Sequence, residues 1–132
     1  WSRGRVTLLG DACHAMLPFL AQGAAQAMED GVTLAALLSD LGSPASVPEA
    51  LGVYESVRRP RVTRVQRMAS DNKTRLHLPD GPAQQARDAQ LASGTTDIFF
   101  SAWEWLYRHD PEAALTQTHR TILHRNRNRD PA

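Results

Sequence analysis

The chain has 132 residues and a net charge of +1, because 15 Lys and Arg nearly balance 14 Asp and Glu. This length corresponds to one domain or part of one. A hydrophobic content of 42 % excludes a wholly disordered chain. The charge balance argues against a dedicated nucleic-acid-binding protein, and no uncharged apolar run approaches the roughly 20 residues of a membrane span. We therefore expect neither nucleic acid nor a membrane as a partner.

The single cysteine excludes a disulfide framework and fits a reducing compartment, so we expect a cytoplasmic protein. The chain begins with Trp1, and its first residues do not resemble a signal peptide. Residues 5–9 form a short apolar run between Gly4 and Gly10, typical of a buried strand of about five residues. Residues 11–22 predict a loop that is unusually apolar for a solvated connection.

Two long helices are predicted next. Residues 23–41 follow the 3.6-residue period of an amphipathic helix, with Glu29 and Asp30 on a different face from the apolar residues. The sequence from Ser46 to Glu49 has the form of a capping box and starts a second helix that runs to about residue 76. Its predicted kink is at Pro60. Its predicted buried stripe is Leu51, Tyr54, Val57, Val62, Val65 and Ala69.

Five arginines lie on or near the opposite side of this second helix: Arg58, Arg59, Arg61, Arg64 and Arg67. A solvated face is the favoured interpretation, and a nucleic-acid-binding stripe is the weaker one because no aromatic residues alternate with the arginines. A third interpretation is that Arg58, Arg59 or Arg61 caps the first helix or pairs with Glu29 and Asp30.

The remaining sequence predicts a turn at residues 77–82, a weak polar helix at 83–92 and an aromatic-rich helix at 98–108. Asp110 is the predicted cap of a last helix. The single predicted strand cannot satisfy its ladder hydrogen bonds alone. We therefore expect a mostly α fragment, with one or two short strands and four or five helices, of a larger α/β protein.

The strand, the Gly10-Asp11 pair and a helix that opens with Gly23-Ala24-Ala25 together suggest a ligand site. A helix N-terminus presents unpaired N–H groups and about half a positive charge. The Asp11 carboxylate can accept hydrogen bonds from sugar-like hydroxyls. The pattern thus indicates a ligand with a hydroxylated chain and a polar ring edge; the alternative is an ordinary strand-turn-helix in which Asp11 caps a turn.

Residues 10–30, GDACHAMLPFLAQGAAQAMED, resemble the second flavin-binding motif of the single-component FAD-dependent aromatic hydroxylases, in particular the salicylate hydroxylase-like enzymes. Residues 54–61, 77–82 and 105–110 also resemble stretches of these enzymes, so the resemblance covers most of the chain. The Gly-x-Gly-x-x-Gly motif, which holds the ADP part of FAD in this family, is not in the sequence.

The resemblance implies FAD as cofactor, NADH or NADPH as co-substrate, and hydroxylation of a small aromatic substrate by O2. It implies that Asp11 binds the ribityl chain, that Pro18 lies near the isoalloxazine ring, and that the amides of the first helical turn face the pyrimidine edge. No catalytic base is identified. The expected cofactor-binding residues are Gly10, Asp11, Pro18, Gly23, Ala24 and Ala25.

The implied fold is an α/β FAD-binding Rossmann-like fold. Residues 1–42 would be the C-terminal part of the FAD-binding domain, residues 43–125 a C-terminal helical region and residues 126–132 a disordered tail. The expected partner is the missing N-terminal half of the same protein, and the chain alone is expected to be inactive. Two alternatives remain: a non-catalytic α-helical interaction domain, and another FAD-dependent oxidoreductase, namely an oxidase, epoxidase or halogenase.

Two residues inside the motif have structural interpretations. His14 is expected to be a hydrogen-bonding structural histidine and Cys13 a small packed residue rather than a nucleophile. Adjacent Cys and His do not have the spacing of a metal site, and we expect no metal. The other four histidines form no zinc pattern either: His77, His109, His119 and His124.

Overall fold

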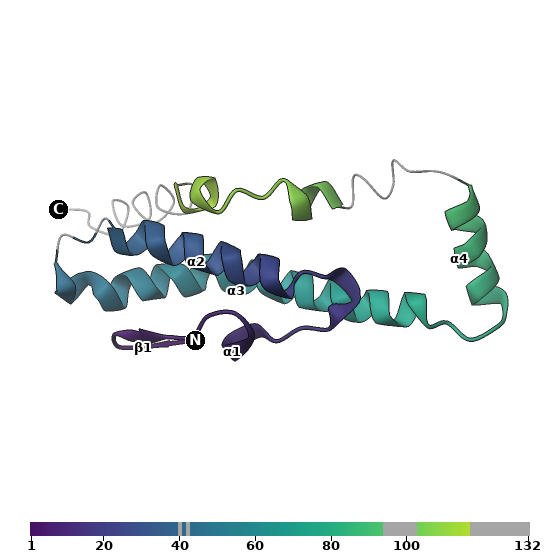
Figure 1. Ribbon diagram of the computed structural model, residues 1–132, viewed down its shortest axis with the longest axis horizontal. Helices are drawn as coiled ribbons and strands as arrows, with labels where there is room; N and C mark the ends of the chain where they lie inside the picture. The colour runs from purple at the N-terminus through teal and green to yellow at the C-terminus, as the bar shows by residue number, and fades with distance from the viewer. Residues whose placement is uncertain (40, 42, 94–102, 117–132) are drawn as a thin grey trace, which may run out of the picture.

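The computed structural model describes residues 1–39, 41, 43–93 and 103–116. Helices α2 and α3 lie side by side in opposite directions, and the N-terminal segment and residues 103–116 pack along this pair (Figure 1). The described part is thus mostly helical, as predicted. Its elements are β1 (Ser2–Arg3), β2 (Val6–Thr7), α1 (Asp11–His14), the 3-10 helix η1 (Pro18–Leu20), α2 (Gly23–Ser39), the 3-10 helix η2 (Pro44–Ser46), α3 (Val47–Leu76) and α4 (Pro82–Ala92).

The prediction of a buried strand of about five residues at 5–9 is wrong, because the strand found there is short and exposed. Strand β2 has two residues and pairs antiparallel with β1, in the register Ser2 with Thr7. Gly4, with a φ of +60°, makes the turn between the two strands. The side chains of Val6 and Leu8 are 68 % and 43 % exposed, because no other described strand lies beside β2. The apolar run therefore forms the edge of a small hairpin.

Helix α2 begins at Gly23, as predicted, but it turns its polar face to the rest of the molecule. An amphipathic helix normally packs its apolar stripe on the core. In α2 the apolar Met28 and Leu38 are 66 % and 42 % exposed, and the buried residues are Gln26, Asp30 and Thr33. The reason is electrostatic: the facing side of α3 presents two arginines that pair with the carboxylates of α2.

Helix α3 runs unbroken through Pro60 and ends at the predicted residue 76. The capping box is wrong, because the Ser46 side chain makes no cap hydrogen bond; instead, the Ser43 hydroxyl accepts from the amide of Ala45 in η2. The predicted stripe is buried except for Val57, which is half-buried.

The solvated-face interpretation of the arginines is wrong for Arg58 and Arg61, which are buried, and correct for the exposed Arg59, Arg64 and Arg67. Arg58 and Arg61 belong to the buried side of α3 because they have acidic partners across the helix interface. Such partners cannot be recognised from the period of α3 alone.

A small core lies where η1, the middle of α3 and residues 103–106 meet. It consists of Leu20, Val65, Ala69 and Leu106, with Met16, Met68, Trp103 and Trp105 packed against it. Helix α4 buries none of its residues and lies at the far end of α3 (Figure 1). The Asp110 carboxylate caps the helical stretch 111–116 as predicted, since it accepts from the amides of Glu112 and Ala113. The predicted helix at 98–108 lies partly, and the predicted tail at 126–132 wholly, outside the described residues.

Candidate functional site

Asp11 lies beside the beginning of α2, as a shared ligand site requires. Its side chain is exposed, and its Oδ1 atom lies 3.9 Å from the position that a Cβ on Gly23 would take. The Cγ atom of Met16 lies at the same distance. The Asp11 carboxylate and the Met16 side chain therefore both lie close to the backbone that begins α2.

The first turn of α2 presents free hydrogen-bond donors. Within the described part of the chain, no acceptor takes a hydrogen bond from the amides of Gly23, Ala24 or Ala25. The amide of Gln26 is the first to be paired, with the carbonyl of Gln22 at 2.9 Å. Unpaired amides and the helix dipole attract an electron-rich edge. The residues present therefore fit the flavin ring edge that the sequence predicts here.

The loop that carries Pro18 is held by α3. Pro18 is exposed and begins η1. The amide side chain of Asn72 donates to the carbonyl of Phe19 at 2.6 Å, and that of Gln66 donates to the carbonyl of Ala15 at 2.9 Å. Leu20 anchors the loop in the core. Sequence reasoning missed both amide anchors, because nothing in the pattern of α3 separates them from ordinary surface residues.

Gly10 is buried against α2 rather than open to a ligand. Its φ is +59° and its ψ is −139°, and a Cβ there would lie 3.2 Å from the Cβ of Ala27. Its amide donates to Oδ2 of Asp30 at 3.0 Å. Gly10 is therefore the point where the chain crosses α2, and its direct contact with a cofactor stays a prediction.

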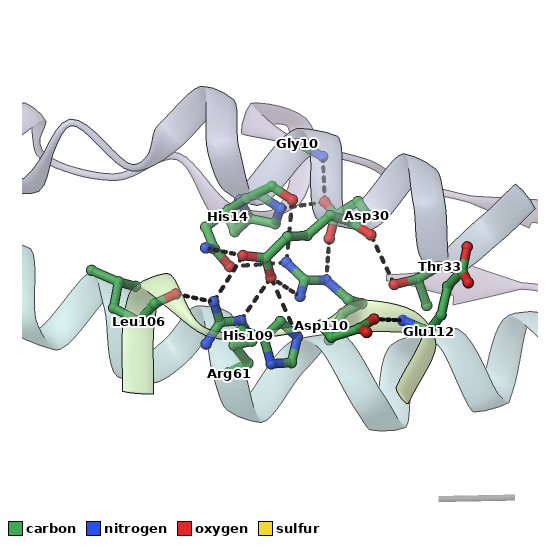
Figure 2. A network of polar contacts seen from close by, with 12 residues as sticks. Gly10, His14, Asp30, Thr33, Arg61, Leu106, His109, Asp110 and Glu112 are labelled. Atoms are coloured by element: carbon green, nitrogen blue, oxygen red, sulfur yellow. Dashed lines mark hydrogen bonds and ion pairs between the residues drawn. The ribbon is translucent and has the colours of Figure 1, made fainter. Parts of the chain in front are cut away.

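Asp30 is the centre of a buried polar network (Figure 2). Besides the Gly10 amide, its carboxylate accepts from His14 Nε2 at 2.5 Å and from Arg58 Nε at 2.7 Å. All three side chains are at most 1 % exposed. Burial acts to raise the pKa of Asp30, but the hydrogen bonds from Arg58 and His14 outweigh it and hold this pKa below its ordinary value. Asp30 is thus ionised, and the structural role predicted for His14 is confirmed.

Glu29 extends the network to Arg61 and, through Arg61, to the segment 103–116. It accepts from Arg58 Nη1 at 2.5 Å and from Arg61 through two nitrogens, at 2.7 and 2.8 Å. Burial acts to raise the pKa of Glu29, but the Arg61 hydrogen bonds and the Arg58 charge lower it below its ordinary value. Arg61 also donates to the carbonyl of Leu106 at 3.0 Å. The predicted pairing of Arg58 and Arg61 with Glu29 and Asp30 is therefore confirmed.

Cys13 lies close to this network, and the sulfur, imidazole and carboxylate ligand atoms of Cys13, His14 and Asp30 are within 4.8 Å of one another. Burial, and then the Asp30 charge, raise the pKa of the Cys13 thiol. Both oxygens of Asp30 already accept hydrogen bonds, and the Arg58 cation lies against them. The chemistry of this cluster is therefore that of a hydrogen-bond network, and it does not suit a cation. Two of the four histidines considered for zinc, His119 and His124, lie outside the described residues.

Comparison with known proteins establishes the family. The sequence model of the family described as "FAD binding domain" matches residues 1–69, more than half of the chain. The chain belongs to this family. None of the helices in the described part has both the length and the apolar character needed to cross a membrane.

The relatives specify the class further. The chain is 41 % identical over 115 residues to salicylate hydroxylase of Pseudomonas putida, covering 86 % of this chain and 25 % of that protein. It is 51 % identical over 83 residues to 6-hydroxynicotinate 3-monooxygenase of Pseudomonas fluorescens, covering 63 % and 21 %. A solved salicylate hydroxylase substrate complex superimposes with a TM-score of 0.72 and 32 % identity, over 87 % of this chain and 27 % of that one.

These matches confirm the resemblance to the FAD-dependent aromatic hydroxylases of the salicylate hydroxylase type. The chain spans about a quarter of the length of these relatives.

Proposed function

We propose that this chain is part of an FAD-dependent monooxygenase that hydroxylates a small, salicylate-like aromatic ring with O2 and NADH or NADPH. The family match and the names of the relatives support this proposal. Bound FAD supplies the redox and oxygen chemistry, and the protein supplies position and electric field. Within an α/β Rossmann-like fold, residues 1–42 would complete the FAD-binding domain and residues 43–125 would form the helical region beside it.

The observation that carries the proposal is that the exposed Asp11 carboxylate lies beside the unpaired amides that begin α2. Asp11 would accept hydrogen bonds from the ribityl hydroxyls. The amides of Gly23, Ala24 and Ala25 would hold the pyrimidine edge, where negative charge develops on reduction. Pro18 would border the ring. These roles belong to one side of the flavin.

The other side of the cofactor would be held by an N-terminal half of the same protein. That part would also supply the substrate pocket. We therefore propose that the chain alone does not turn over, and that the intact protein works in the cytoplasm. We refer to this larger monooxygenase as the intact protein.

The first test is the visible absorbance of the purified intact protein, followed by oxidation of NADH or NADPH in the presence and absence of aromatic acids. We expect flavin absorbance and stimulation by a hydroxylated benzoate. Flavin without such stimulation would favour an oxidase, epoxidase or halogenase. An intact protein that binds no flavin would favour the helical interaction domain.

The second test concerns Asp11. The substitution Asp11→Ala in the intact protein should weaken FAD binding about tenfold or more, because hydrogen bonds to a charged group contribute about 1.5–3 kcal/mol. FAD titration by quenching of flavin fluorescence gives the Kd.

The matched control for Asp11 is Asp80→Ala, which removes an exposed carboxylate from the turn before α4. It should leave the Kd unchanged. Equal affinities for the Asp11 and Asp80 variants would contradict the role of Asp11.

A further inference from the structure

Helix α2 carries two features of the candidate site at a set spacing. Its first residue, Gly23, begins the turn with unpaired amides, and Asp30 follows seven residues later. Seven residues are two helical turns, about 10 Å along the axis. Asp30 is completely buried, so it is placed to act through its neighbours rather than by touching a ligand.

Two of those neighbours, Gly10 and His14, lie on either side of Asp11 in the chain. The Asp30 carboxylate holds the amide of Gly10, and the carbonyl of Gly10 accepts from the amides of Cys13 and His14, both at 3.0 Å. These bonds begin α1, whose first residue is Asp11. The His14 ring at the end of α1 returns to the same carboxylate. Both ends of α1 are thus tied to one side chain of α2.

We infer that Asp30 is a positioning residue for FAD binding, which sets the placement of Asp11 against the first turn of α2 through Gly10 and His14. This inference rests on the proposed function. Arg58 supports it from the opposite side: its Nε bonds Oδ1, and its Nη2 bonds the side chain and carbonyl of Gln26. With Arg58 on one oxygen and Gly10 and His14 on the other, the Asp30 carboxylate has a single orientation.

The same helix offers a matched control. Thr33 is also fully buried, but among the described residues its hydroxyl bonds only the carbonyl of Glu29 in α2 itself, at 2.8 Å. The substitution Thr33→Val removes a buried hydrogen bond without touching Gly10 or α1. A loss of FAD binding that follows general destabilisation would appear in this variant too.

The experiment measures the FAD Kd of the folded intact protein together with hydrogen exchange of the peptide that covers residues 10–14. For Asp30→Asn we expect about tenfold weaker FAD binding and faster exchange in that peptide, as for the loss of hydrogen bonds to a charged group. Thr33→Val should change neither quantity. Binding by Asp30→Asn as tight as that of Thr33→Val would overturn the inference.

If Asp30→Asn does not fold, two His14 variants test the positioning role instead. His14→Gln keeps an N–H donor near the Nε2 position, and His14→Leu removes it. We expect His14→Leu to weaken FAD binding several-fold and His14→Gln to restore most of the affinity. Equal affinities in the two variants would overturn the inference.

The Asp11→Ala measurement separates the two proposals. If Asp11→Ala loses affinity while the Asp30 and His14 variants do not, only the positioning role fails. If Asp11→Ala binds FAD normally, the proposed site fails and the positioning role fails with it.

Discussion

Gly10 has a backbone conformation, φ +59° and ψ −139°, that residues with a side chain rarely adopt. It also lies so close to α2 that a Cβ would be 3.2 Å from the Cβ of Ala27. The glycine of the Gly-Asp pair is therefore required by the way the chain crosses the helix. The carboxylate of its neighbour Asp11 is exposed and lies beside the start of α2.

The substitution Gly10→Ala should destabilise the intact protein by about 1–3 kcal/mol, the usual cost of forcing a side chain into such a conformation. The change is measured as a lower urea midpoint. Gly31→Ala is the control, because a Cβ at Gly31 of α2 meets nothing within 4 Å. It should be neutral or stabilising by up to about 1 kcal/mol, since alanine favours a helix. The same loss in both variants would contradict this account of Gly10.

At the scale of elements, α2 and α3 meet through paired charges. Arg58 and Arg61 of α3 bind Glu29 and Asp30 of α2, and nearly all of these groups are buried. Removing one partner from a buried pair usually costs about 3–5 kcal/mol, because the other charge is left unpaired. This interface is therefore specific: few other faces of the two helices would satisfy these charges.

The interface should weaken in acid. Because the pKa values of Glu29 and Asp30 are lowered in the folded protein, the unfolded chain takes up protons first as the pH falls. Their contribution to the free energy of unfolding is complete above the ordinary carboxyl pKa, about 4, and is lost as the pH falls through the lower folded values. Urea unfolding of the intact protein followed by circular dichroism at pH 7, 5 and 3 measures it.

Glu29→Gln is the control for this pH dependence, because the amide does not titrate. The variant should be less stable than the native sequence at pH 7, and the difference should shrink at pH 3. A difference that stays constant over this range would show that Glu29 is not ionised against Arg58 and Arg61.

At the scale of the whole molecule, Arg61 connects α2 and α3 to the segment 103–116. Besides Glu29, it bonds the carbonyl of Leu106, and the Arg64 side chain lies 3.7 Å above the ring of Trp105. His109 lies 3.6 Å from Glu29. Burial, and then the Arg61 charge, lower the pKa of His109. This segment is therefore attached to the same network that holds Gly10.

Arg61→Gln should release this segment. We expect faster chymotryptic cleavage at the aromatic residues 103–107 of the intact protein, measured by mass spectrometry of the fragments. Arg67→Gln, which changes an exposed arginine of the same helix, should leave cleavage unchanged. Equal rates in the two variants would contradict the connecting role of Arg61.

Exposed apolar side chains also matter at this scale. Val6 of β2 and Met28 and Leu38 of α2 lie open in the described part of the chain. Exposed apolar side chains mark a contact surface when they form a contiguous patch, whereas single ones are common. If a further part of a larger α/β protein packs on this chain, as proposed, these side chains become buried in the intact protein.

Local patterns predicted the long elements well. The 3.6-residue period and the Gly-Ala-Ala opening placed the start of α2, and the following pattern placed the end of α3. The structure places Asp11 of the Gly-Asp motif beside Gly23, and its role in cofactor binding stays a prediction. Such features depend on residues close in sequence, so the sequence contains what is needed to predict them.

By itself, then, the sequence determined the helices, the flavin motif and the family. Only the tertiary structure decided which face of α2 is buried, which arginines of α3 are buried, and which side chains of α3 hold the Pro18 loop. The reason is that the Arg58–Asp30 and Asn72–Phe19 contacts join residues 28 and 53 positions apart. The free energy of a buried charge or amide depends on its partner across the helix interface, and no local pattern specifies that partner.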